Sequence, residues 1–191
     1  MGTPLRMVVL GRQGSGKGTQ SFRVAETFGC VHVSTGDVLR AAVAEGTELG
    51  RQAAEIMESG GLVGDDIMNG VVGDRLGKDD IVAGGVLLDG FPRTAEQADA
   101  LERILTDLGQ SLTLAVNLEV PVAEVRARMI ARGREDDTPE AIDRRLALYE
   151  EQTAPLLAWF DDHGLLETVD GIGSEDEVFE RLHEAILERL D

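Results

Sequence analysis

Residues 11–20 read Gly-Arg-Gln-Gly-Ser-Gly-Lys-Gly-Thr-Gln and directly follow the apolar run Met7–Leu10. The repeated glycines let a backbone curl without Cβ clashes, so that successive N–H groups point at one anion beside the start of the next helix. Lys17 adds a positive charge for the outer phosphates of a nucleotide. The stretch therefore predicts a phosphate-binding loop between a buried strand and a helix, with a nucleoside triphosphate as its ligand.

One detail of this loop departs from the usual pattern, which places Ser or Thr directly after the lysine to meet Mg²⁺. Here Gly18 follows Lys17, and Thr19 comes one position later. A glycine-rich strand–helix turn with a stray lysine is the alternative interpretation, but the strand, the spacing and the lysine together favour phosphate binding. The residues expected to bind the triphosphate in this loop are Gly14, Ser15, Gly16, Lys17, Gly18 and Thr19.

The composition of the chain limits the classes of function open to it. With 191 residues, 42 % of them hydrophobic, it can build one α/β domain with a full core. A net charge of −18 argues against a nucleic-acid-binding surface. No segment approaches the ~20 apolar residues of a membrane span, and no signal peptide is evident, so we expect a cytoplasmic protein. No coiled coil is evident either, and we expect a monomer.

Cys30 is the single cysteine of the chain, which excludes an internal disulfide and a cysteine-rich zinc site. We therefore expect no structural zinc, and a buried apolar role for this thiol. The three histidines, His32, His163 and His183, lie near the ends of predicted elements, where surface or capping roles are expected rather than catalysis.

Short apolar runs alternate with helical patterns, which predicts βα units, a parallel sheet and the α/β fold class. We expect a three-layer P-loop fold with a five-stranded parallel sheet. Ser34, Thr138 and Ser174 are predicted to cap the helices that follow them. The expected strands are Met7–Leu10, Val31–Val33, Val86–Leu88, Leu114–Leu118 and Glu167–Val169. The expected helices are Gly16–Thr27, Gly36–Ala44, Gly50–Ser59, Asp65–Gly77, Thr94–Leu108, Val122–Ala131, Pro139–Asp161 and Glu175–Leu190.

Two stretches interrupt this alternation. Residues 35–64 form a predicted all-helical insertion between the second and third strands, and residues 132–138 a short polar loop between two long helices. Glycines or charges flank both, as is typical of moving elements near a site. We expect a single domain over residues 1–191. Its core would comprise residues 1–34, 65–131 and 139–191.

A second motif, Asp89-Gly90-Phe91-Pro92-Arg93, lies at the carboxyl end of the third predicted strand. In open α/β sheets that edge faces the ligand crevice. Asp89 can approach Mg²⁺ directly or through water, and the turn formed by the next three residues lets Arg93 reach a phosphate. A capped strand–turn–helix with a surface arginine is the alternative, and the nearby phosphate loop favours the functional interpretation.

The phosphate loop with its Gly-Lys-Gly-Thr-Gln sequence, together with the Asp-Gly-Phe-Pro-Arg motif, resembles adenylate kinases and related nucleoside monophosphate kinases. The resemblance extends from about residue 6 to residue 190. It implies reversible, Mg²⁺-dependent transfer of a phosphoryl group from ATP to AMP, giving two ADP and serving adenine nucleotide homeostasis. ATP, AMP and ADP are the ligands it implies.

The same resemblance implies an AMP site. Ser34–Arg40 is similar to the start of the monophosphate-binding insertion, so that Thr35 would meet the adenosine and Arg40 the phosphate. Gln97 matches a glutamine that reads the adenine edge; an exposed helix glutamine is the alternative. The remaining AMP-binding residues implied are Gly61, Leu62, Val63, Gly90, Phe91, Pro92, Arg93, Arg134 and Arg145.

An arginine set near the short loop is the third resemblance. Arg128 and Arg132 share one helix face because they are four residues apart. Solvated arginines beside acidic neighbours are the alternative interpretation. The resemblance implies that Arg128 lies over the ATP adenine, that Arg132 contacts ATP, and that the backbone of Gly173 meets the same adenine. The implied catalytic residues are Lys17, Asp89, Arg93, Arg132, Arg134 and Arg145.

The chain also departs from the family pattern. Arg12 and Gln13 replace a small residue and a proline in the phosphate loop. The loop 132–138 is too short to hold the four-ligand zinc cluster of some members, so the chain is similar to short-form adenylate kinases. We expect closure of this lid to contribute less than movement of residues 35–64.

Two other functions stay open on the sequence. A UMP/CMP kinase of the same fold is the nearer one, although Thr35 and Gln97 favour adenine. A catalytically silent nucleotide-binding regulatory protein is the other, although the cation set is intact. No general base is expected in either kinase, because the attacking phosphate of a monophosphate is already anionic.

Overall fold

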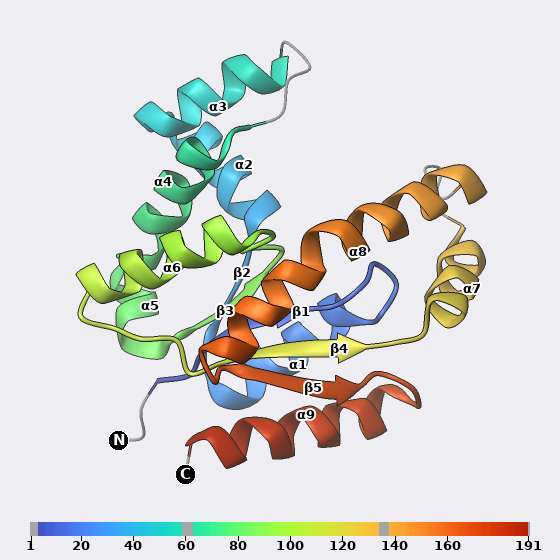
Figure 1. Ribbon diagram of the computed structural model, residues 1–191. Coiled ribbons are helices and arrows are strands. Elements are labelled where there is room, and N and C mark those ends of the chain that lie inside the picture. Colours follow the sequence, from blue (N-terminus) through green and yellow to red (C-terminus); the bar gives the residue numbers. More distant parts are fainter. Residues whose placement is uncertain (1–3, 59–62, 134–137, 191) are drawn as a thin grey trace.

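The computed structural model describes residues 4–58, 63–133 and 138–190. Within them, five strands form one sheet, as predicted: β1 (Arg6–Leu10), β2 (Val31–Ser34), β3 (Val86–Asp89), β4 (Leu114–Glu119) and β5 (Leu166–Asp170). Their order is β2-β3-β1-β4-β5, and every pair of neighbours is parallel. Because all strands run the same way, the loops that follow β1 and β3 leave the sheet at one edge, side by side (Figure 1).

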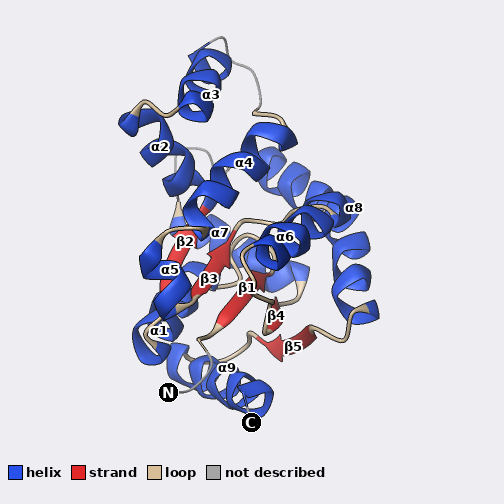
Figure 2. Cartoon of the chain, turned by 90° about the vertical axis from the view of Figure 1, so that its left-hand side faces the viewer, coloured by secondary structure: helices blue, strands red, loops and turns tan. Residues whose placement is uncertain are grey.

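Helices cover both faces of the sheet, which makes the predicted three layers. Val8 and Leu10 of β1 pack with residues of α6 (Ala95–Asp107) and α8 (Pro139–Asp162). Met7 and Val9 point the other way and pack with α1 (Lys17–Phe28) and α9 (Glu175–Leu190) (Figure 2). The alternation of side chains along a strand thus gives each face its own hydrophobic core.

Between β2 and β3 the chain forms α2 (Thr35–Glu45), α3 (Glu48–Glu58) and α4 (Asp65–Leu76), which pack on one another. The α3 end of this group projects away from the sheet (Figure 1). The predicted start of α3 at Gly50 is two residues late, because the hydroxyl of Thr47 accepts a hydrogen bond from the Gly50 N–H and so caps an earlier turn.

The short helix α5 (Asp79–Gly84) was not among the predicted elements. Six residues are too few to show a helical period, and Lys78 provides no side-chain cap. The helix ends at Gly85, which has φ +86°, and a Cβ there would lie 2.2 Å from the Leu5 carbonyl oxygen. The glycine therefore lets α5 turn directly into β3.

The remaining helix, α7 (Val122–Arg132), packs on the first half of α8 through the buried side chains of Val125, Met129 and Ile142. The three predicted caps are confirmed: the hydroxyls of Ser34, Thr138 and Ser174 each accept the N–H three residues later. In the described part of the chain, no helix has the length and hydropathy needed to cross a membrane.

Candidate nucleotide-binding site

The phosphate loop lies between β1 and α1, and its curl depends on glycine. Gly14 and Gly16 have φ values of +88° and +98°, which side-chain-bearing residues rarely adopt. A Cβ on Gly14 would also lie 2.9 Å from Cγ of Met129. Gly16 caps α1 without any side-chain hydrogen bond, so the first N–H groups of the helix are left for a ligand.

Lys17 reaches back across this loop. Its Nζ donates to the carbonyl oxygens of Gly11 at 2.6 Å and Arg12 at 3.0 Å. Burial lowers the pKa of Lys17, the Asp89 carboxylate opposes that shift, and Arg93 adds to it. The ammonium group is thus held at the loop, close enough to Asp89 and Arg93 of the second motif to interact electrostatically with both.

Two hollows meet at this lysine, since Gln13 and Lys17 line both. The donor hollow, as we name the first, measures about 510 Å³ and is further lined by Gly14, Gly16, Gly18, Thr19, Asp89, Arg128, Met129 and Arg132. The acceptor hollow measures about 330 Å³, and its polar lining includes Arg93, Arg145, Tyr149, Gln152 and Thr153. The two hollows therefore adjoin at Lys17, and each has two arginines in its lining, Arg93 and Arg145 in one and Arg128 and Arg132 in the other.

The turn after β3 forms the wall between the sheet and α2. Gly90 has φ +87°, and a Cβ there would lie 2.8 Å from Oγ1 of Thr35. The Gly90 carbonyl oxygen accepts from Oγ1 of Thr35 at 3.2 Å and from Nε of Arg93 at 2.9 Å. Phe91 is buried and is joined to Pro92 by a cis peptide bond. The motif therefore ties the start of α2 to the arginine at the acceptor hollow.

Gln97 is buried in the first turn of α6, and its amide is held from both sides. Its Oε1 accepts from the backbone N–H of Arg93 at 2.8 Å, and its Nε2 donates to Oδ1 of Asp65 at 2.7 Å. A glutamine amide has two donors and two acceptor lone pairs. These two contacts fix the orientation of the amide and leave one donor and one lone pair unused.

Arg128, which lines the donor hollow, is linked by a hydrogen bond to the loop that contains Gly173. Arg128 donates from Nη2 to the Gly171 carbonyl oxygen at 3.4 Å and from Nε to Glu124 at 2.8 Å. Gly173 closes the same loop with φ +126°, and a Cβ there would lie 2.7 Å from Oε2 of Glu177. The guanidinium of Arg128 thus lies beside the loop that contains Gly173.

Several predicted residues line neither hollow: Ser15, Thr35, Arg40, Val63, Phe91, Gln97 and Gly173. Arg40 is exposed and pairs with Asp37 on its own helix, Nη2 to Oδ1 at 2.5 Å. Hydrogen bonds from Ser34 and Arg40 lower the pKa of Asp37. Val63 is half-buried just before α4. Gly61, Leu62 and Arg134 lie outside the described residues.

Other site residues were not predicted. Tyr149, Gln152 and Thr153 line the acceptor hollow, and their spacing along α8 follows one helix face, which a search for helical period could have found. Arg12 fastens the phosphate loop to α8 through Glu150, with Nε 2.7 Å from Oε1. His32, expected to be a surface or capping residue, lies 3.6 Å from Oδ2 of Asp89. Only the pairing of β2 with β3 places it there, and the sequence does not show that pairing.

The described residues contain no group of three or more His, Cys, Asp or Glu side chains that could hold a metal ion. The donor hollow does offer two hard oxygen donors, the half-buried carboxylate of Asp89 and the hydroxyl of Thr19. Such a pair suits Mg²⁺, which keeps several waters and is usually shared with substrate phosphates. The donor set therefore fits a magnesium ion that a nucleotide brings in.

A phosphate-binding loop at the carboxyl edge of a parallel sheet, where two arginine-bearing hollows share one lysine, defines a P-loop protein of the phosphotransferase class. Residues 9–165 match the family model described as adenylate kinase. The chain is 48 % identical over 186 residues to an adenylate kinase of Xanthomonas euvesicatoria pv. vesicatoria (strain 85-10), covering 95 % of this chain and 99 % of that protein. Over the same lengths it is 46 % identical to an adenylate kinase of Stenotrophomonas maltophilia (strain K279a).

The chain belongs to the adenylate kinase family. The predicted family, the α/β fold and the enzyme class, a phosphotransferase, are therefore confirmed.

Proposed function

We propose that this enzyme transfers the terminal phosphoryl group of Mg·ATP to AMP, reversibly, across the boundary between the donor and acceptor hollows. The observation that carries the proposal is that the two hollows adjoin at Lys17. Lys17 and Gln13 line both hollows, and each hollow has arginines of its own. Two nucleotides bound with their phosphates toward Lys17 would present the reacting groups to each other in line, which is the positioning that phosphoryl transfer requires.

In the donor hollow, ATP would place its phosphates on the N–H groups of Gly14–Thr19 and its adenine between Arg128 and the loop of Gly173. The uncapped start of α1 supports the first contact. The hydrogen bond from Arg128 to the Gly171 carbonyl oxygen supports the second, because it holds arginine and loop side by side. Arg132 also lines this hollow.

AMP would direct its phosphate into the acceptor hollow, toward Arg93 and Arg145, and its adenine toward Gln97, which lies outside that lining but accepts a hydrogen bond from the Arg93 N–H. Donor and acceptor together on one amide match an adenine edge. Thr35 would support the adenosine through its contact with the Gly90 turn. By resemblance we also assign to this site Arg40, Gly61, Leu62, Val63, Gly90, Phe91, Pro92 and Arg134.

The chain's own contribution to the reaction is positioning and charge. Lys17, Arg93, Arg132, Arg134 and Arg145 would neutralise the oxygens of the transferring group, and no side chain needs to remove a proton. Magnesium, held by Asp89 and the phosphates, supplies further charge neutralisation when it is bound. Asp89 lines the donor hollow next to Lys17 and suits that role.

We further propose that residues 35–64 act as an AMP-binding insertion and residues 132–138 as a short lid on one domain, residues 1–191. The packing of α2 on α3, the two helices within residues 35–64, supports a unit that can move as a body. We expect the enzyme to work as a cytoplasmic monomer that binds no nucleic acid and holds no structural zinc.

The deciding experiment incubates the purified protein with Mg·ATP and AMP, CMP, UMP or GMP in turn, and follows diphosphate formation. The proposal expects AMP to be used far faster than the other three. Equal turnover of UMP or CMP would make the protein a pyrimidine nucleotide kinase. Tight nucleotide binding without turnover would make it a regulatory protein.

A further inference from the structure

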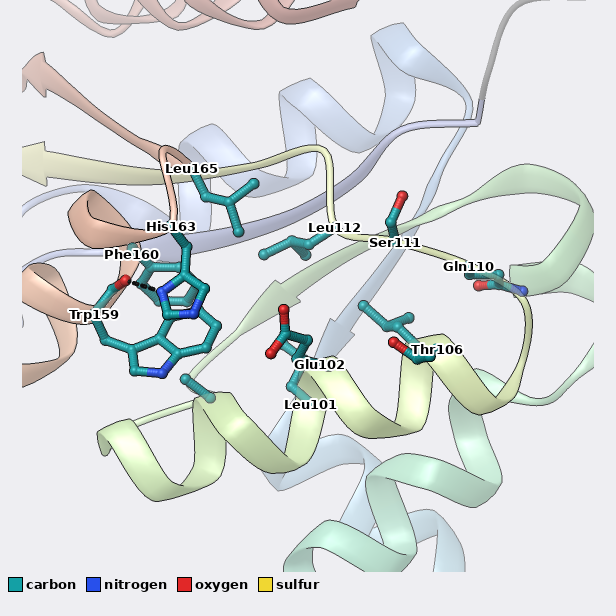
Figure 3. Close-up of a pocket in the computed structure, with 12 residues that line it drawn as sticks. Leu101, Glu102, Thr106, Gln110, Ser111, Leu112, Trp159, Phe160, His163 and Leu165 are labelled. Carbon is teal, nitrogen blue, oxygen red and sulfur yellow. Dashed lines mark hydrogen bonds between the residues drawn. The ribbon is translucent and has the colours of Figure 1, made fainter.

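A separate cavity of about 240 Å³ lies between α6 and the end of α8. We call it the α6–α8 cavity. Ser111 and Leu112, from the loop before β4, and Leu165, from the loop before β5, close one side of it (Figure 3). Both loops lead into the amino ends of their strands, whereas the nucleotide hollows lie at the carboxyl edge of the sheet. None of its lining residues belongs to either hollow.

The wall of the α6–α8 cavity is aromatic and fixed in place. The rings of Trp159 and His163 stack with centroids 3.8 Å apart and planes 16° apart. Nε1 of Trp159 donates to Oδ1 of Asp99 at 2.7 Å, and Nδ1 of His163 lies 2.6 Å from the Trp159 carbonyl oxygen, to which it must donate. Beneath this wall, the buried side chains of Leu101, Leu105 and Phe160 form an apolar floor. A flat ring would find a preformed apolar slot here.

The polar side of the α6–α8 cavity is negative. Glu102 is exposed at the mouth of the cavity, its carboxylate points into the space between Trp159 and Thr106 (Figure 3), and it has no hydrogen bond or ion pair within the described residues. Among the described residues, no lysine or arginine lines the cavity, and the Arg6 guanidinium donates from Nε to Oε1 of the lining residue Gln110 at 2.7 Å. Thr106 and His163 lie at the C-terminal ends of α6 and α8, where the helix dipoles are negative. Anions are therefore disfavoured and a cation is favoured.

We propose that the α6–α8 cavity binds a small, flat aromatic cation, such as a protonated aromatic amine or amidine. The ring would lie on the leucine floor against Trp159, and the cationic group would pair with Glu102. Its volume suits one ring with a head group, since a cavity of about 150 Å³ is enough for benzene. Binding here is independent of the phosphoryl-transfer site.

Three probes of the same shape test the charge preference: benzamidine, which is a cation, benzamide, which is neutral, and benzoate, an anion. Trp159 is the single tryptophan of the chain, so its fluorescence reports on the cavity directly. We expect a saturable change with benzamidine at low salt, about fivefold weaker binding of benzamide, because an exposed ion pair contributes up to about 1 kcal/mol, and the weakest binding of benzoate. The indole N–H signal of Trp159 in a ¹H–¹⁵N NMR spectrum should shift in the same titration.

Glu102→Gln removes the charge and keeps the shape of the side chain. It should bring benzamidine and benzamide to within about twofold of each other, while kinase activity stays unchanged. Glu188→Gln is the matched control, because Glu188 is exposed on α9 across the sheet and its loss changes the net charge equally. That control should keep the full preference for benzamidine.

Three results would overturn the proposal. The first is the lack of any saturable response of Trp159 to benzamidine. The second is an unchanged preference for benzamidine in Glu102→Gln. The third is displacement of benzamidine by ADP, which would place the probe in a nucleotide hollow instead.

Discussion

The ammonium group of Lys17 is held by two carbonyl oxygens that leave its charge unneutralised, Gly11 O at 2.6 Å and Arg12 O at 3.0 Å. A nucleotide phosphate would supply the missing negative charge at the point where the two hollows meet. Lys17→Met should therefore lower kcat by about 10²–10³, the usual effect of losing one charge contact to the transition state. The measurement is ADP formation at saturating ATP and AMP.

Lys78→Met is the control for this variant, because Lys78 is the other lysine of the chain and is exposed. It should keep normal turnover. A Lys17→Met enzyme with more than half of the original activity would contradict the role given to Lys17.

Asp65 is expected to act through Gln97. Its Oδ1 accepts from Nε2 of Gln97 at 2.7 Å and so prevents the amide from turning over. Asp65→Ala should raise KM for AMP about fivefold to tenfold, the effect of about 1 kcal/mol from one hydrogen bond, with little change in KM for ATP. Steady-state kinetics with each nucleotide varied in turn would measure both constants.

Two further variants separate the loss of the Asp65–Gln97 hydrogen bond from the loss of a carboxylate at the start of α4. Asp65→Asn keeps an acceptor oxygen and should stay close to the parent enzyme. Asp66→Ala removes a neighbouring exposed carboxylate from the same first turn of α4 and should leave KM for AMP unchanged. Equal effects of Asp65→Ala and Asp66→Ala would mean that the helix start, and not Gln97, is what the carboxylate serves.

Cys30 is buried, and burial raises the pKa of its thiol from 9.0 to about 11. A raised pKa keeps the thiol protonated, so at pH 8 the reactive thiolate should be about 100-fold scarcer in the folded protein than in the unfolded chain. Alkylation by iodoacetamide should be slower by at least that factor and should quicken about tenfold per pH unit up to pH 11. Native labelling within tenfold of the rate in urea would contradict this.

Among the elements, α8 has its start fixed by one side chain. The hydroxyl of Thr138 accepts the Ala141 N–H at 3.2 Å, and Pro139 takes the first helical position. Thr138→Ala should destabilise the fold by about 1 kcal/mol, whereas Thr138→Ser should keep the cap. Urea denaturation of both variants tests this, and an alanine variant as stable as the parent would show that packing on α7 alone sets the start of α8.

The helices and strands whose patterns are long or flanked by caps were predictable from the sequence. The start of α9 is an example, since Ser174 and Glu177 exchange hydrogen bonds as a capping box. The helix α5 was not predictable, because it has six residues and is held by its position between α4 and β3. On α8, Arg145 was predicted but Tyr149, Gln152 and Thr153 were missed. Their spacing shows that they share a helix face, but a helix of 24 residues with a broad apolar pattern does not show that this face lines a hollow.

For the molecule as a whole, the two site motifs could be predicted from the sequence, whereas the long-range contacts around them could not. The two motifs after β1 and β3 were evident because each has a distinctive local sequence, and their strands pair directly. The approach of His32 to Asp89, and the link from Arg12 to Glu150 across 138 positions, arise only when the sheet and α8 assemble. Contacts of this kind have no local sequence signature.

The charge of the chain affects stability and nucleotide binding in opposite ways. Its 36 acidic and 18 basic side chains give −18, so the folded molecule repels itself, whereas its nucleotide site gathers Lys17, Arg93 and Arg128 around two hollows. Salt at 0.1 M screens exposed charges over about 10 Å. Added NaCl should therefore raise the melting temperature and, over the same range, weaken ATP binding, because a dispersed repulsion and a local attraction are screened alike. Thermal melts and ATP titrations along one salt series measure both. A melting temperature that falls with salt would mean that surface ion pairs such as Arg126–Asp143 and Arg189–Glu167 outweigh the net repulsion.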